Sequence, residues 1–135
     1  MTYRLGTTSL ARLQKVHPLL SACVVRAIKV TSADFTVFEG LRTLERQQKL
    51  FDSGATKTLN SRHLVGKAVD LPAWLKGRPV WDPVAAQQIA NAMFHASKEC
   101  GVTLRWGGDW DMDGDQSDET FRDLVHFELP QSVYG

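Results

Sequence analysis

Two imidazoles and one carboxylate, carried by two distant segments, are the side chains in this sequence best suited to chemistry. His63 and Asp70 lie in the segment Ser61–Asp70, and His126 lies in the segment Asp123–Leu129. Two histidines and one carboxylate form the ligand set of a catalytic zinc ion that keeps its fourth position for water. We therefore predict that the two segments meet around one zinc ion, with His63, Asp70 and His126 as its ligands.

The pattern around these residues indicates how they are positioned. Alternation in the second segment predicts a strand with a polar face and an apolar face. His126 and Glu128 share the polar face, where Glu128 is placed to orient His126 through its free ring nitrogen. Asp123 enters the strand three residues earlier, so a turn brings its carboxylate beside a metal-bound water, and we predict that it is the catalytic base. In the first segment, Gly66 permits the tight turn that brings its two ligands to a common point.

The order and spacing of these motifs resemble a known family. The pattern Ser-x-His-x-x-x-x-x-x-Asp with an internal Gly-x-Ala, followed much later by Asp-x-x-His-x-Glu, is similar to the zinc D-Ala-D-Ala carboxypeptidase and dipeptidase group. Within it, the chain most resembles the L-alanyl-D-glutamate endopeptidases that bacteriophages use as endolysins. Asp123 fits that branch, because the carboxypeptidase branch usually carries Glu there. The resemblance covers nearly the whole chain, including residues 38–43 and 105–110.

The resemblance implies a small α+β domain of the Hedgehog/DD-peptidase-like kind, with helices packed on one side of an antiparallel sheet and a zinc cleft on the other. It implies a zinc-dependent peptidoglycan hydrolase that cleaves the L-Ala to D-Glu bond of the stem peptide with metal-activated water. Arg42, emerging on a loop after Gly40, matches the arginine that contacts substrate and stabilises the charge developing on the scissile carbonyl. Ser61 fits a contact to the ligand shell, a contact to a substrate carboxylate, or a turn cap. We expect Gln47 to be solvated.

Two other functions stay open. One is a D-Ala-D-Ala carboxypeptidase or dipeptidase, since the sequence does not show the stereochemistry of its substrate. The other is a non-catalytic wall-binding module stabilised by zinc or calcium. Structural zinc sites are normally closed by a fourth protein ligand, and neither Cys23 nor Cys100 lies near the two segments, which argues against the module. We expect both cysteines to be buried thiols.

An acidic loop lies between the two segments and is a candidate site for a second metal ion. Six carboxylates occur within residues 109–119: Asp109, Asp111, Asp113, Asp115, Asp118 and Glu119. The first positions, with Gly114, match an EF-hand calcium loop, but the twelfth position is Thr120 instead of Glu. Three interpretations compete: a calcium site that orders the loop, a solvated acidic lid, or additional zinc ligands. Oxygen ligands favour calcium over zinc.

Capping residues and hydrophobic periodicity predict the elements that hold these side chains. Helices are expected over residues 9–15, from Pro18 through Ile28, over 44–53, and from Asp82-Pro83 to Gly101, with Thr8 or Ser9 capping the first. Strands are expected over residues 35–39, 68–71, 102–106 and 123–129, and residues 74–79 are expected to form a loop.

Length and composition limit the remaining choices. A chain of 135 residues is expected to be a single zinc peptidase domain over residues 1–135, with no separate cell-wall-binding domain. A net charge of +1 offers no basic face for nucleic acid. We expect a monomer that binds the stem peptide and forms no stable membrane association. Without a signal peptide or transmembrane run, it is expected in the host cytoplasm, and the resemblance implies release to the wall through a separate membrane-permeabilising protein.

Overall fold

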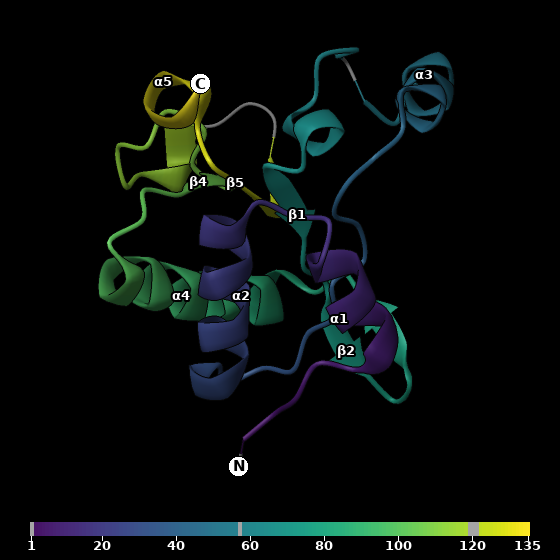
Figure 1. Ribbon diagram of the computed structural model, residues 1–135. Helices are drawn as coiled ribbons and strands as arrows, with labels where there is room; N and C mark the ends of the chain where they lie inside the picture. Colours follow the sequence, from purple (N-terminus) through teal and green to yellow (C-terminus); the bar gives the residue numbers. More distant parts are fainter. Residues whose placement is uncertain (1, 57, 119–121) are drawn as a thin grey trace.

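The computed structural model describes residues 2–56, 58–118 and 122–135, drawn as coloured ribbon in Figure 1. Its helices are α1 (Thr7–Leu13), α2 (Pro18–Val30), α3 (Leu44–Asp52), α4 (Pro83–Cys100) and α5 (Gln131–Tyr134), with short 3-10 turns η1 (Arg62–Val65) and η2 (Gln116–Asp118). Its strands are β1 (Ala68–Asp70), β2 (Ala73–Leu75), β3 (Arg78–Val80), β4 (Arg105–Gly107) and β5 (Asp123–Glu128). This mixture of helices and antiparallel strands confirms the predicted α+β class.

The antiparallel sheet has the strand order β1-β5-β4, and β2 pairs with β3 in a separate hairpin. Along the β1–β5 pair, Asp70 lies opposite His126 and Ala68 lies opposite Glu128. Residues directly opposite in an antiparallel pair project from the same face of the sheet. The register therefore places two of the predicted ligands, from segments far apart in the sequence, side by side.

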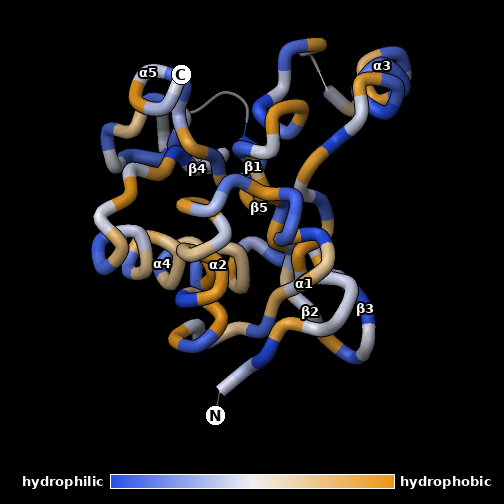
Figure 2. The backbone as a smooth tube through the Cα atoms, viewed as in Figure 1, coloured by the Kyte–Doolittle hydropathy of each residue, from blue (hydrophilic) through white to orange (hydrophobic). Residues whose placement is uncertain are grey.

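The hydrophobic core lies between the sheet and two packed helices, α2 and α4, which lie below the sheet in the view of Figure 1. Leu20 and Val24 of α2, Ile89 and Met93 of α4, and Phe127 of β5 are almost completely buried there. In Figure 2 both hydrophobic and hydrophilic residues occur along α2, as expected for an amphipathic helix. Because Phe127 enters the core, its neighbours His126 and Glu128 point to the opposite face of β5.

The caps of the long helices agree with the sequence prediction. Helix α2 begins at Pro18, and the side chain of Asp82 accepts a hydrogen bond from the backbone nitrogen of Ala85 at the start of α4. Gly101 ends α4 in the left-handed conformation. These ends are locally encoded, because each depends on one capping residue and the residues beside it.

Four predicted elements differ from the structure. The strand predicted over residues 102–106 begins only at Arg105, as β4. Residues 35–39 form only isolated bridges, Phe35 with Ala73 and Glu39 with Asp70, and no regular strand. The predicted loop over residues 74–79 is instead the β2–β3 hairpin. Helix α1 begins at residue 7, earlier than predicted, and its cap position is Gly6 instead of Thr8 or Ser9. The Ser9 hydroxyl accepts a hydrogen bond from the backbone nitrogen of residue 37, so a tertiary contact uses the group predicted as a cap.

Two further observations concern the surface of the fold. Cys23 is buried as expected, whereas Cys100 is exposed at the end of α4, so the prediction of two buried thiols is wrong for the second cysteine.

None of the helices in the described part of the chain combines the length and apolar character needed to cross a membrane.

Candidate metal centre

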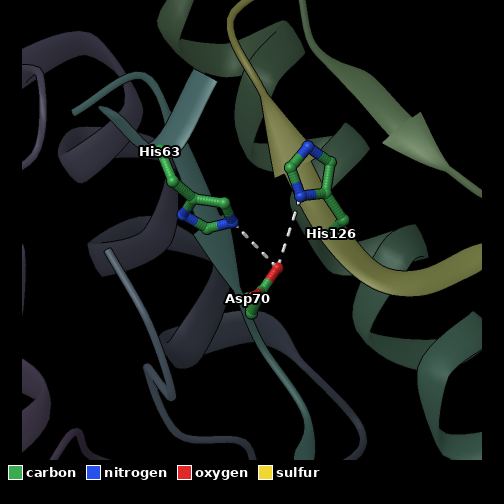
Figure 3. A group of neighbouring side chains, drawn as sticks. All are labelled: His63, Asp70 and His126. Carbon is green, nitrogen blue, oxygen red and sulfur yellow. Dashed lines mark hydrogen bonds and ion pairs between the residues drawn. The ribbon is translucent and has the colours of Figure 1, made fainter. Parts of the chain in front are cut away.

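The three predicted ligands converge from three different elements. His63 comes from η1, Asp70 ends β1, and His126 lies on β5. His63 Nε2 is 3.2 Å from Asp70 Oδ1, and His126 Nδ1 is 3.3 Å from the same oxygen. Figure 3 shows both rings directed at this one carboxylate. One ligand atom from each residue lies within 4.8 Å of the others, so the structure brings together two nitrogens and an oxygen at a single point.

The turn that carries His63 is fixed by its two end residues. The Ser61 hydroxyl accepts a hydrogen bond from the backbone nitrogen of His63 at 3.2 Å, as an N-cap. Gly66 ends the turn at φ 70°, and an added Cβ there would also meet the carbonyl oxygen of Lys15. The predicted glycine turn is therefore present, and Ser61 acts as a cap that positions a ligand-bearing residue.

Each imidazole has one nitrogen held by an acceptor outside the cluster. His63 Nδ1 donates to the carbonyl oxygen of Gly40 at 2.8 Å, since a carbonyl can only accept. His126 Nε2 lies 2.8 Å from Glu128 Oε1, the contact expected from the strand pattern. In these tautomers, each neutral ring directs one nitrogen lone pair at the anionic Asp70 oxygen. Only a cation or additional protons can stabilise this arrangement of lone pairs around a negative charge. This donor set of two nitrogens and one carboxylate fits zinc.

The electrostatics of the cluster agree with a strong affinity for positive charge. Burial raises the pKa of Asp70, but hydrogen bonds from His126 and His63 outweigh it and hold that pKa well below its usual range. Burial lowers the pKa of His126, but its hydrogen bonds with Asp70 and Glu128 raise that pKa to about 9. The buried carboxylates thus attract protons to the place where a metal ion would bind, and metal and protons compete for the ring nitrogens.

Asp123 lies at the start of β5, beside the cluster. Burial raises the pKa of its carboxyl group, and the negative charge of Asp70 raises it further. The charges of His126 and His63 act on Asp123 in the opposite direction. Asp123 does not belong to the group of three whose ligand atoms converge, which is the placement expected of a base and not of a ligand.

Gly107 allows the backbone of β4 to approach Asp123 closely. The β4–β5 register shifts between Trp106 and Gly107, and Gly107 lies opposite Asp123. A Cβ added at Gly107 would overlap the backbone carbonyl of Asp123. We expect Gly107→Ala to destabilise the protein by about 1–3 kcal/mol through this clash and to displace Asp123 from its place beside the cluster. Thermal unfolding would be measured beside Gly6→Ala, whose Cβ meets nothing within 4 Å; equal behaviour of the two variants would contradict the prediction.

Arg42 lies on a loop, as predicted, but its side chain is largely buried. Only 8% of its side chain is exposed. Its Nε and Nη2 donate to the two carboxylate oxygens of Glu39 at 2.7 Å each, and its Nη1 donates to Gln47 Oε1 at 2.8 Å. The same guanidinium lies 3.7 Å from Asp70 Oδ2. Arg42 therefore places a buried positive charge beside the central carboxylate of the cluster.

Sequence reasoning missed the two residues that hold Arg42. Gln47 was expected to be solvated but is fully buried, and its amide nitrogen donates to the carbonyl of Thr58 at 2.6 Å. The spacing of Glu39 and Arg42 is typical of an ion pair within one turn, and that signal could have identified Glu39. No sequence signal distinguishes Gln47 from an exposed helical glutamine.

The acidic loop follows β4 and contains a second cluster. Carboxylate oxygens of Asp109, Asp111 and Asp113 lie within 4.8 Å of one another. The loop also uses its carboxylates internally: Asp109 accepts from the nitrogen of Gly114, and Asp115 accepts from the nitrogen and hydroxyl of residue 117. Glu119 and the side chain of Asp118 lie outside the described residues. The calcium site therefore stays a prediction.

Trp110 connects this loop to the metal centre. Its ring centroid lies 5.3 Å from that of His126, and the Arg105 guanidinium lies 4.9 Å above the Trp110 ring. Arg105 is also 3.9 Å from Glu128. The loop thus contacts a predicted ligand through an aromatic ring, and none of the loop carboxylates that the structure describes belongs to the His63 cluster.

Comparisons with known proteins agree with this geometry. Residues 1–130 match the model of the phage L-alanyl-D-glutamate peptidase family. The L-alanyl-D-glutamate peptidase of Escherichia phage T5 is 32% identical over 96% of this chain and 99% of its own length. The peptidoglycan L-alanyl-D-glutamate endopeptidase CwlK of Bacillus subtilis (strain 168) is 28% identical over 84% of this chain and 73% of its own. The crystal structure of the Serratia marcescens L-Ala D-Glu endopeptidase ChiX superimposes with a TM-score of 0.82, at 36% identity, covering 97% of this chain and 93% of that one.

Proposed function

The chain belongs to the phage L-alanyl-D-glutamate peptidase family, and from this premise we propose that it is a zinc-dependent endolysin. Its reaction is hydrolysis of the L-Ala to D-Glu bond in the peptidoglycan stem peptide. The convergence of His63, Asp70 and His126 on one point is the observation that supports this function most strongly. The family match favours this bond over the D-Ala-D-Ala bond of the alternative peptidase.

Each residue of the centre has a distinct part in the proposed mechanism. His63, Asp70 and His126 would hold the zinc ion, which would supply a water activated near neutral pH and a Lewis acid for the scissile carbonyl. Asp123 accepts the proton of the attacking water and passes it to the leaving amine. Its raised pKa suits this work, because a carboxylate of higher pKa is a stronger proton acceptor. Glu128 keeps His126 in the tautomer that presents Nδ1 to the metal.

Arg42 contacts the same centre through the second carboxylate oxygen of Asp70. Its guanidinium donates hydrogen bonds to Glu39 and Gln47, and these bonds hold it beside the Asp70 carboxylate. We propose that this charge holds Asp70 in its ionised form and in position to bind metal. Direct stabilisation of the scissile carbonyl by Arg42 stays a prediction.

Access to the substrate needs a second component. Peptidoglycan lies outside the cytoplasmic membrane, whereas a phage protein is made inside the host. We propose that a separate membrane-permeabilising protein lets this enzyme reach the wall, and that the enzyme acts there as a monomer on the stem peptide.

Mass spectrometry of fragments released from purified peptidoglycan tests the function directly. With zinc present, we expect stem peptides that begin at D-Glu, and we expect a chelator to abolish their release, because the water would lose its activation. Release of terminal D-Ala alone would move the assignment to a carboxypeptidase. Absence of cleavage by protein shown to contain zinc would favour the non-catalytic module.

The same assay, with calcium added, tests whether the acidic loop binds calcium. If calcium binds the loop as predicted, calcium added to the zinc-loaded enzyme is expected to change the cleavage rate, because Trp110 links the loop to His126. An unchanged rate, together with no calcium binding in calorimetry at millimolar concentrations, would remove the calcium hypothesis.

A further inference from the structure

A pocket of about 230 Å³ is lined in part by Asp123, and the mechanism above gives no role to its other lining residues. Most of its wall is apolar and comes from the β2–β3 hairpin, the start of α4 and the start of β5, with Val80, Trp81, Pro83 and Leu124 among the lining residues. None of the three predicted metal ligands lines it within the described part of the chain. A substrate that places its scissile bond against Asp123 therefore has this pocket within reach on one side.

Three charged residues line the pocket, and only one of them is uncommitted. Asp82 accepts a hydrogen bond from Ala85 as the cap of α4, and Asp123 is the proposed base. Arg122 is exposed and makes no hydrogen bond or ion pair with any residue that the structure describes. Among the described residues, the pocket consequently presents one guanidinium without a partner, next to the proposed catalytic carboxylate. A guanidinium in this setting favours an anionic partner, above all a carboxylate, which it binds through two parallel hydrogen bonds.

The proposed mechanism indicates which substrate group lies there. Asp123 delivers a proton to the leaving amine, so the substrate residue that carries this amine must lie against Asp123. In the stem peptide that residue is D-Glu, whose chain continues through its γ-carboxyl group. Its α-carboxylate is therefore free and is attached to the same carbon as the leaving nitrogen. A cation adjacent in sequence to Asp123 is well placed to bind it.

We propose that Arg122 is a specificity-determining residue that binds the free α-carboxylate on the leaving-group side of the scissile bond. This inference rests on the proposed function. The apolar wall suits the aliphatic part of the same substrate residue. Trp81, 57% exposed, is braced there by the edge of the Phe38 ring at a centroid distance of 5.3 Å.

Calorimetric binding of reaction products to the zinc-loaded enzyme tests this assignment without turnover. The probes are D-Glu linked through its γ-carboxyl group to a diamino acid, with the D-Glu α-carboxylate either free or converted to an amide. We expect the wild-type chain to bind the free acid about tenfold or more tightly than the amide, because hydrogen bonds to charged groups are strong. Arg122→Gln is expected to lose most of this preference. Arg78→Gln removes a charge from the same exposed hairpin, outside the pocket lining, and is expected to retain it.

A third probe separates two carboxylates that this cation could bind. In it the diamino acid carboxylate is an amide and the D-Glu carboxylate is free. Weakened binding of this probe alone would assign Arg122 to the diamino acid and overturn the D-Glu assignment. An equal preference in wild type and Arg122→Gln would overturn the role of Arg122.

Cleavage of stem peptides with D-Glu or its α-amide is measured in parallel. We expect kcat/KM of the wild-type chain to favour the free acid and Arg122→Gln to reduce that ratio by about tenfold. Cleavage by the wild type with a ratio unaffected by Arg122→Gln would reject this inference and leave the proposed function standing. Failure of zinc-loaded wild type to cleave either peptide would reject the proposed function and this inference with it.

Discussion

Asp123→Asn is expected to bind zinc as the wild-type chain does and to lose turnover by about 10²–10⁴-fold, the usual contribution of a general acid and base. The carboxamide has nearly the same shape as the carboxylate but cannot accept the proton of the attacking water. Zinc binding is expected to persist because Asp123 lies outside the group of three converging ligands. Zinc content after dialysis and the rate of stem-peptide cleavage would be measured on the same samples.

A matched carboxylate far from the centre controls for this substitution. Asp52 lies at the end of α3 and accepts a hydrogen bond from Gln48, so Asp52→Asn is expected to leave both zinc content and turnover unchanged. Retained activity in Asp123→Asn would reassign the base, most directly to Glu128, whose Oε1 lies 2.8 Å from His126. Loss of zinc in Asp123→Asn would instead make Asp123 a ligand and close the fourth position.

The group of His63, Asp70 and His126 could be predicted because the information for it is local and chemical. Only a few residue types bind zinc, and the strand alternation around His126 states which side chains share a face. For these three residues, the structure adds the register that sets Asp70 opposite His126. That register depends on β1 and β5 meeting across more than fifty intervening residues, and no local pattern specifies such a pairing.

The errors occurred where tertiary contacts decide the structure. Strand-forming residues over 35–39 lack a continuous partner and therefore make only isolated bridges. The β2–β3 hairpin has strands of three residues, too short to show alternation, and a proline within β3 argued against a strand. Its turn residue Lys76 has φ 53°, a conformation that lysine rarely adopts and that cannot be predicted from the residue type.

The surroundings of Arg42 show the same limit within the site itself. Arginine side chains are mostly exposed, but Glu39 lies in the bridge to Asp70 and binds the guanidinium of Arg42 beside the cluster. The charge of Arg42 is therefore already paired with carboxylates of the protein itself. Arg122, which has no such partner among the described residues, is the cation left for the substrate on the side of Asp123.

The second large effect is expected from His63→Ala, which should lose both zinc and activity. His63 is 2% exposed, with Nδ1 held by the Gly40 carbonyl and Nε2 directed at the cluster. Among the described residues, no other side chain belongs to this group of converging ligands with Asp70 and His126. Loss of an outer hydrogen-bond partner typically weakens zinc binding by 10–100-fold, and loss of a ligand is expected to exceed about 100-fold. Zinc affinity would be measured by competition with a chelator, and folding by thermal unfolding of the metal-free forms.

His95→Ala removes an exposed imidazole from α4 that pairs only with Glu99 in the described structure, and it is expected to bind zinc normally. Partial recovery of His63→Ala activity at high zinc concentration would agree with weakened binding, because the base and the two other ligands remain in place. Tight zinc binding by folded His63→Ala would remove His63 from the ligand set. The two variants thus separate the parts of the centre: without Asp123 the metal stays and the proton transfer fails, whereas without His63 the proton acceptor stays and the metal is lost.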